Sequence, residues 1–136
     1  VCREGKQLAI LALGSLISPA LEAAEELARK GIDAMVINPR FIKPLDTSLL
    51  ESLFRRGLPL VTAEEGCLMG GFGASILEVA SEMGFTPAVL RLGIPDAFVP
   101  QGSLAELRAM LGLDAAGILL RVQEWMQQRQ LAASAC

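Results

Sequence analysis

Histidine and tyrosine are both absent from this chain of 136 residues, and aromatic side chains make up only 4% of it. Without histidine, the chain lacks the side chain that most often serves as a general base near neutral pH, and without tyrosine it lacks a phenol that can donate a proton. Ser75 and Cys67 therefore have no imidazole to activate them as nucleophiles. We expect no catalytic residue in this chain.

Paired or clustered cysteines are also lacking. The three thiols, Cys2, Cys67 and Cys136, are odd in number and widely spaced. This spacing argues against both a disulfide framework and a zinc site, so we expect no bound metal. Unpaired thiols fit a reducing compartment, and the sequence therefore predicts a cytoplasmic protein.

Apolar runs of membrane-spanning length are missing as well, although 52% of the residues are hydrophobic, because charged residues interrupt them. The net charge is −3, and Arg55-Arg56 is too small a basic cluster for a nucleic-acid footprint. We therefore expect neither a membrane nor a nucleic acid as a partner. The apolar excess predicts a buried parallel sheet, an interface with a protein partner, or both.

Four short apolar runs alternate with amphipathic stretches, which is the pattern of strands joined by helices. The expected strands cover residues 8–13, 34–38, 58–63 and 88–92. Helix starts are indicated by side chains that can cap free amides or by a proline in the first turn, and near Phe72 by the apolar stripe alone. The predicted starts are Ser18-Pro19, Asp46, Phe72, Ser103 with Glu106, and Asp114.

Strands that alternate with helices through short connections imply right-handed crossovers and a mostly parallel sheet covered on both faces. The predicted fold class is therefore α/β, a three-layer α/β/α sandwich with a mostly parallel sheet of about five strands. We expect residues 1–126 to form one domain and the polar, alanine-rich residues 127–136 to form a frayed tail.

Two adjacent carboxylates, Glu64 and Glu65, follow the third expected strand, at the sheet edge where ligand sites gather. Neighbouring residues of a strand point to opposite faces, which would separate these two side chains. The favoured interpretation is structural: one glutamate caps or orients the following glycine-rich loop, and the other is solvated. An acid–base role is the alternative interpretation.

Gly66, Gly70, Gly71 and Gly73 form a loop that enters the third expected helix and could present amides to a phosphate. Their spacing matches neither the dinucleotide-binding fingerprint nor a P-loop. Close backbone packing or a subunit contact is therefore favoured over anion binding.

Arg40 and Lys43 follow the second expected strand and lie on the same rim as Glu64. A phosphate could bind them, but ion pairs with nearby carboxylates, Asp46, Glu64 or Glu65, are the favoured interpretation. The sequence thus predicts a rim that serves as a ligand site or an interface. Its members are Arg40, Lys43, Glu64, Glu65, Gly70, Gly71 and Gly73.

Four motifs occur in an order that is typical of one enzyme family. They comprise residues 40–46, residues 62–66 with 69–73, residues 93–102, and residues 111–117. Together they resemble the C-terminal domain of the 1-deoxy-D-xylulose-5-phosphate synthase family, over residue 8 to about residue 126. The first motif is shared loosely with transketolases and with the beta subunits of 2-oxo-acid dehydrogenases, so the C-terminal domain of one of those enzymes is an alternative.

The resemblance implies a transketolase-like C-terminal domain that supports a homodimer and packs against upstream catalytic domains of the same chain. Enzymes of this family condense pyruvate with glyceraldehyde 3-phosphate, release carbon dioxide, and use thiamine diphosphate with a magnesium ion. The family holds the diphosphate through an upstream Gly-Asp-Gly motif, which does not occur in this sequence. The resemblance therefore implies an excised, non-catalytic domain that binds neither cofactor and is inactive alone.

Two further hypotheses remain open. The first is a regulatory site for a phosphorylated metabolite or a nucleotide, bound between Arg40, Lys43 and the glycine-rich loop. It depends on their common position at the carboxyl edge of the expected sheet. The second is a free-standing protein-interaction module.

Overall fold

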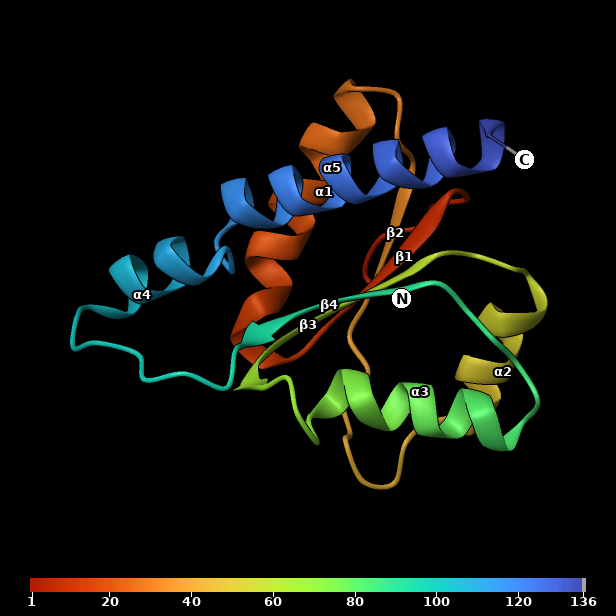
Figure 1. Ribbon diagram of the computed structural model, residues 1–136, viewed down its shortest axis with the longest axis horizontal. Coiled ribbons are helices and arrows are strands. Elements are labelled where there is room, and N and C mark those ends of the chain that lie inside the picture. The colour runs from red at the N-terminus through yellow and green to blue at the C-terminus, as the bar shows by residue number, and fades with distance from the viewer. Residues whose placement is uncertain (136) are drawn as a thin grey trace.

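A four-stranded sheet lies between two helical layers in the computed structural model, which describes residues 1–135 (Figure 1). The strands alternate with helices, as expected, until two consecutive helices close the chain. In order, the elements are β1 (Leu8–Ala12), the short 3₁₀ helix η1 (Gly14–Leu16), α1 (Ile17–Arg29), β2 (Ala34–Ile37), α2 (Thr47–Arg55), β3 (Leu60–Cys67), α3 (Phe72–Glu82), β4 (Val89–Ile94), α4 (Leu104–Leu111) and α5 (Ala115–Ser134).

All strand pairs in the sheet are parallel, in the order β2-β1-β3-β4. The α/β sandwich is thus confirmed, but the described residues contain four strands instead of about five. An isolated antiparallel bridge between Arg3 and Val36 occupies the position that a fifth strand would take beside β2. The N-terminal segment lies so close to β2 there that a Cβ atom at Gly5 would come within 2.7 Å of the Ala34 carbonyl oxygen.

The two faces of the sheet are covered by different helices. Helices α1 and α5 cover one face, and α2 and α3 cover the other (Figure 1). Small side chains on α1, including Ala20 and Ala24, are fully buried and allow this helix to approach the sheet closely. Larger side chains such as Phe54 and Phe72 fill the space under α2 and α3. Every residue of β1 and β2 is buried, as a sheet covered on both faces requires.

The predicted caps are confirmed at three helices. The side chain of Asp46 accepts a hydrogen bond from the Leu49 amide, that of Ser103 from Glu106, and that of Asp114 from Gly117. The cap expected at Ser18 is wrong, because α1 begins at Ile17 and the Ser18 hydroxyl donates to Glu22 instead. The 3₁₀ turn η1 before α1 brings the chain into the helix without a side-chain cap.

The last helix is longer than the sequence pattern indicates. Helix α5 continues to Ser134, and the side chains of residues 127–135 are exposed. Fraying of this segment stays a prediction, and Cys136 lies outside the described residues. Among residues 1–135, no helix combines the length and the apolar character that crossing a membrane requires.

Candidate functional site

The carboxyl ends of β1 and β3 form the point where the sheet topology changes direction. These two strands are neighbours, yet the chain leaves β1 toward one face through α1 and leaves β3 toward the other through α3. In open α/β sheets, the crevice between such strands is the usual ligand site. Ser15 follows β1 at this point, and Glu64 and Glu65 lie near the end of β3.

Strand β3 is longer than expected and includes both glutamates, because it continues to Cys67 through an irregularity in its pairing with β4. Glu64 points toward α3, and Glu65 points toward η1 and α4. The predicted separation of the two carboxylates is therefore confirmed. They do not form a pair that could share a proton.

Glu64 is buried, with 3% of its surface exposed, and its carboxylate lies against the first turn of α3. Oε2 accepts a hydrogen bond of 2.8 Å from the Phe72 amide, and Oε1 accepts one of 2.9 Å from the Gly73 amide. Helix N-termini attract anions because their first amides are free and the helix dipole is positive there. The protein's own carboxylate thus occupies the place that an exogenous phosphate would need.

The glycines around this carboxylate are required by close packing. A Cβ atom at Gly71 would lie 2.5 Å from Glu64 Oε2 and closer still to the Cys67 carbonyl oxygen. A Cβ atom at Gly73 would lie 2.5 Å from Thr62 Oγ1. Gly70 adopts a positive φ of 68°, which glycine reaches without strain. These features account for three of the glycines, and Glu64 already occupies two amides that the regulatory hypothesis would need, those of Phe72 and Gly73.

Glu65 has a different environment, since it belongs to a polar network on the other side of β3. Its Oε2 accepts from the Ser15 hydroxyl at 2.7 Å, and its Oε1 accepts from Arg108 Nε at 2.6 Å. The Ser15 hydrogen bond, together with Arg108, holds the pKa of the Glu65 carboxyl below its ordinary value, although partial burial opposes the shift. Glu65 is thus bound by two groups and is not merely solvated, which corrects that part of the expectation.

Arg40 and Lys43 do not form the expected ion pairs. Within residues 1–135, neither side chain lies in an ion pair, and Glu65 pairs with Arg108 of α4 instead. Arg40 has a positive φ of 65°, and its amide donates to Asn38 Oδ1 at 2.9 Å. The rim role of these residues stays a prediction. The partner Arg108 was missed because it is 43 positions from Glu65 and no local pattern connects them.

A shallow hollow of ≈ 440 Å³ lies at the switch point. Its walls come from the segments after β1 and β2 and from the end of β3: Leu13, Gly14, Ser15, Asn38, Arg40, Ile42 and Glu65. The single carboxylate in it is already bound by Ser15 and Arg108. Throughout residues 1–135, no three His, Cys, Asp or Glu residues are grouped so that they could hold a metal ion. The hollow can therefore bind a partner or a small polar group, but it does not supply an acid–base pair.

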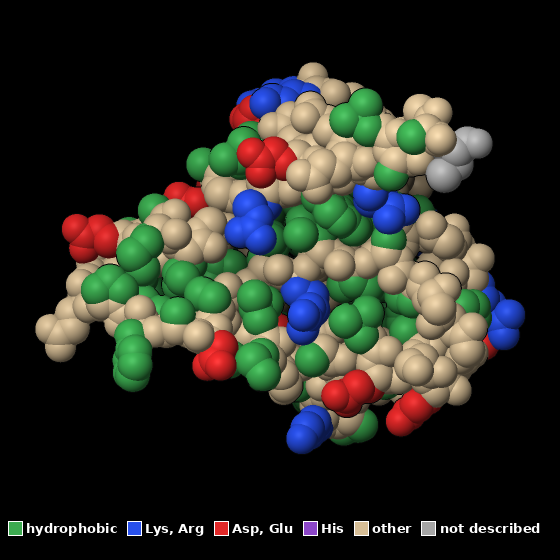
Figure 2. Space-filling model, viewed as in Figure 1, with side chains coloured by type: hydrophobic (Ala, Val, Ile, Leu, Met, Phe, Trp, Pro, Cys, Tyr) green, Lys and Arg blue, Asp and Glu red, His purple; other side chains and the backbone are tan. Residues whose placement is uncertain are grey.

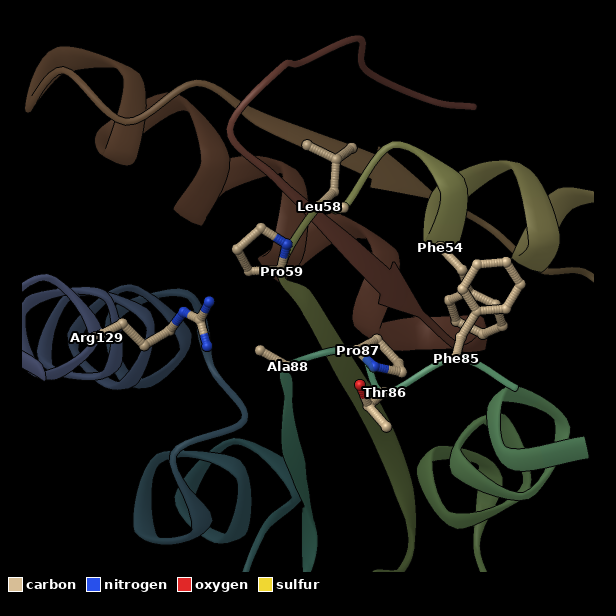
Figure 3. A pocket seen from close by; sticks show the side chains of 9 residues that line it. Phe54, Leu58, Pro59, Phe85, Thr86, Pro87, Ala88 and Arg129 are labelled. Atoms are coloured by element: carbon tan, nitrogen blue, oxygen red, sulfur yellow. The ribbon is translucent and has the colours of Figure 1, made fainter. Parts of the chain in front are cut away.

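A second hollow, of ≈ 450 Å³, lies at the opposite, amino edge of the sheet. Figure 3 shows its walls, in which the rings of Phe54 and Phe85 lie beside one another with their centroids 5.4 Å apart. Arg129 extends from α5 toward Pro59 and Ala88 and is the only charged residue among those that line it. The lining residues include the Thr86 hydroxyl but no carboxylate, imidazole or thiol that could activate it, so this hollow does not supply an acid–base pair either.

Comparison with known proteins gives the family. The profile described as "Transketolase, C-terminal domain" matches residues 1–118. The chain belongs to the transketolase C-terminal domain family. A solved relative, described as "Split gene transketolase, inactive beta4 tetramer", superimposes with a TM-score of 0.79 at 37% identity, covering 90% of this chain and 39% of that one.

Curated relatives of this transketolase C-terminal domain include several 1-deoxy-D-xylulose-5-phosphate synthases. Identity is 46% over 98% of the chain for that of Geobacillus thermodenitrificans, 51% over 93% for one from Geobacter metallireducens, and 56% over 84% for that of Methylibium petroleiphilum. The chain spans about a fifth of the length of these relatives, from 17% to 21%. The resemblance that the four motifs predicted is therefore confirmed.

Proposed function

We propose that this chain is the non-catalytic C-terminal domain of a cytoplasmic 1-deoxy-D-xylulose-5-phosphate synthase. In that enzyme it stabilises the homodimer and packs against the upstream domains, which carry out the condensation of pyruvate with glyceraldehyde 3-phosphate. The observation that carries this proposal is the similarity to such synthases along nearly the whole chain, combined with coverage of only about a fifth of their length. The lack of histidine and tyrosine supports a non-catalytic role.

The donor groups of this domain do not fit the cofactors of that reaction. Magnesium is usually held by one or two carboxylates together with phosphate oxygens, and no group of three or more metal-ligating side chains occurs among residues 1–135. The α3 amides that could hold a diphosphate already bind Glu64. We therefore assign thiamine diphosphate and magnesium to upstream domains and derive no step of the reaction from this chain.

A chimera tests the proposal. The matching C-terminal fifth of the Geobacillus thermodenitrificans synthase is replaced by this chain, and deoxyxylulose phosphate formation and dimer mass are measured with both cofactors present. We expect turnover within about tenfold of the parent enzyme, because exposed differences between homologous domains have small effects. The control is the parent enzyme without its last fifth, which should lose dimer stability.

Two results would contradict the proposal. One is a soluble, dimeric chimera without activity, which would show that this domain belongs to a different enzyme. The other is turnover by the 136-residue chain alone, which would place catalytic groups where we find none.

A further inference from the structure

Three loops at the carboxyl edge of the sheet each expose a large apolar side chain. Phe41 follows β2 and is 65% exposed, Met69 follows β3 and is 71% exposed, and Phe98 follows β4 and is fully exposed. Ile42 beside Phe41 is also exposed. Because the strands are parallel, their carboxyl ends and the loops after them lie at one edge of the sheet.

The amino edge of the same sheet has the opposite character. Its connections, residues 30–33, 56–59 and 84–88, are fully described and contain none of the exposed large hydrophobic residues. Where large apolar side chains occur there, they are buried, as at Leu58, or half-buried, as at Ile32 and Phe85. The uncovered apolar side chains in the loops are therefore a property of one edge, and concentration of this kind marks an interaction surface.

Shallow hollows include three of these exposed side chains, Phe41, Ile42 and Phe98. One contains Phe41, Pro44 and Val1, a second is the switch-point hollow with Ile42, and a third contains Cys67, Pro95 and Phe98. Arg40 lines the first two and lacks an ion-pair partner within the described residues. Figure 2 shows hydrophobic side chains gathered on the left, over α4 and the loop before it. The edge thus has exposed apolar side chains, hollows that can accept the side chains of a partner, and the guanidinium of Arg40.

We propose that this carboxyl-edge surface, defined by Phe41, Ile42, Met69 and Phe98, docks onto the upstream catalytic domains of the same polypeptide. The inference rests on the proposed function and specifies the face that such a domain uses. Its partner surface is apolar and carries a carboxylate that pairs with Arg40.

Two observations favour the upstream domains over a second copy as the occupant. Val1 lines the same hollow as Phe41, so a polypeptide that reaches this domain through Val1 arrives at this edge. The relatives are about five times longer than this chain, which provides a large body on the same polypeptide. A tethered partner has a high effective concentration, so an interface of modest area remains occupied.

Hydrogen–deuterium exchange on the active chimera, compared with the 136-residue chain alone, tests this assignment. We expect amides in residues 39–45, 67–71 and 95–102 to exchange about tenfold or more slowly in the chimera, because docking excludes water and restrains these loops. Residues 30–33, 56–59 and 84–88 serve as the internal reference and should not change. Protection confined to the reference segments or to α5 would overturn the docking face, while the activity of the chimera would still support the proposed function.

Charge substitutions give a second test. Phe41→Asp and Phe98→Asp should each leave the thermal midpoint of the isolated chain unchanged, since both side chains are exposed, but should reduce loop protection in the chimera by about tenfold. Leu120→Asp and Leu131→Asp on α5 are matched controls, because they place the same charge at exposed leucines on another face. Equal effects of all four substitutions would contradict the proposal.

Sedimentation of the isolated chain tests whether a second copy of the chain, and not the upstream domains, covers this surface. We expect a monomer at micromolar concentration. A dimer that Phe98→Asp dissociates and Leu131→Asp does not would assign this surface to a second copy, and would overturn the inference even if the chimera is active.

Discussion

The two sides of β3 are joined to their neighbouring helices by adjacent glutamates with different surroundings. On the α3 side, Glu64 is buried and binds two backbone amides. On the α4 side, Glu65 binds Arg108 and Ser15, with 38% of its side-chain surface exposed. Water cannot replace a lost partner in a buried site. A group left without its partner therefore costs much free energy on the α3 side and little on the α4 side. Residues one position apart in a strand therefore contribute very differently to stability.

Removal of the buried carboxylate should have the largest effect. Glu64→Ala leaves two buried amides without an acceptor, and we expect the free energy of unfolding to fall by about 3 kcal/mol. Urea denaturation followed by circular dichroism measures the change, with an unaltered m-value as the check on two-state unfolding. Glu64→Gln keeps one acceptor oxygen and should lose roughly half as much. A loss of stability no larger than that of Glu65→Ala would contradict the conclusion that the buried glutamate contributes more than the exposed one.

Filling the space at Gly71 should come next. Its Cβ atom would collide with the Cys67 carbonyl and with the Glu64 carboxylate, so Gly71→Ala should destabilise the domain by about 2 kcal/mol. Gly102→Ala is the matched control, because its Cβ atom meets its nearest neighbour at 3.4 Å and should change stability by less than about 0.5 kcal/mol. Thermal denaturation of both variants compares them. Similar melting temperatures would contradict the close-packing explanation.

The exposed network should tolerate substitution better. Arg108→Gln removes the charged partner of Glu65, and we expect a loss of about 0.5–1 kcal/mol, discounted for partial exposure. Arg40→Gln removes a charge that forms no ion pair among residues 1–135, so urea denaturation should detect no loss above about 0.5 kcal/mol. A larger loss at Arg40 than at Arg108 would reverse our assignment of the ion pair.

The pH dependence of the Glu65 network should be the smallest effect. Because the folded pKa of Glu65 lies below its unfolded value, 4.5, the network stabilises the fold fully above that value and loses its contribution as the pH falls through the folded pKa. The stability difference between the natural chain and Glu65→Gln should therefore be constant from pH 7 to about 5.5 and shrink in more acidic buffer. A difference that grows on acidification would refute this explanation.

Local patterns predicted much of the fold because they depend on neighbouring residues. The caps at Asp46, Ser103 and Asp114 use an acceptor within three positions of the amide that it binds, so the sequence alone reveals them. The end of β3 was placed too early because charged residues are unusual in a buried strand. Glu64 can be buried in this strand because the first turn of α3 supplies two amides that bind its side chain.

The candidate site was less predictable, because its partners are distant in sequence. Residues Glu65, Ser15 and Arg108 come from three separate segments, and their hydrogen bonds follow from the topology. The motif series was more informative about the family than about geometry. It gave no indication that Arg40 lacks an ion pair within residues 1–135.

The hydrogen bonds of Glu64 also connect the unfolding of two elements. Its side chain belongs to the end of β3, while the amides that it binds begin α3, so a segment that opened alone would leave the buried carboxylate or the buried amides of the other without a partner. The strand end and the first helical turn should therefore open in a single event during native-state exchange, at a free energy close to that of global unfolding. In a larger enzyme, this coupling would transmit a disturbance at the carboxyl edge directly into the helical layer beneath it.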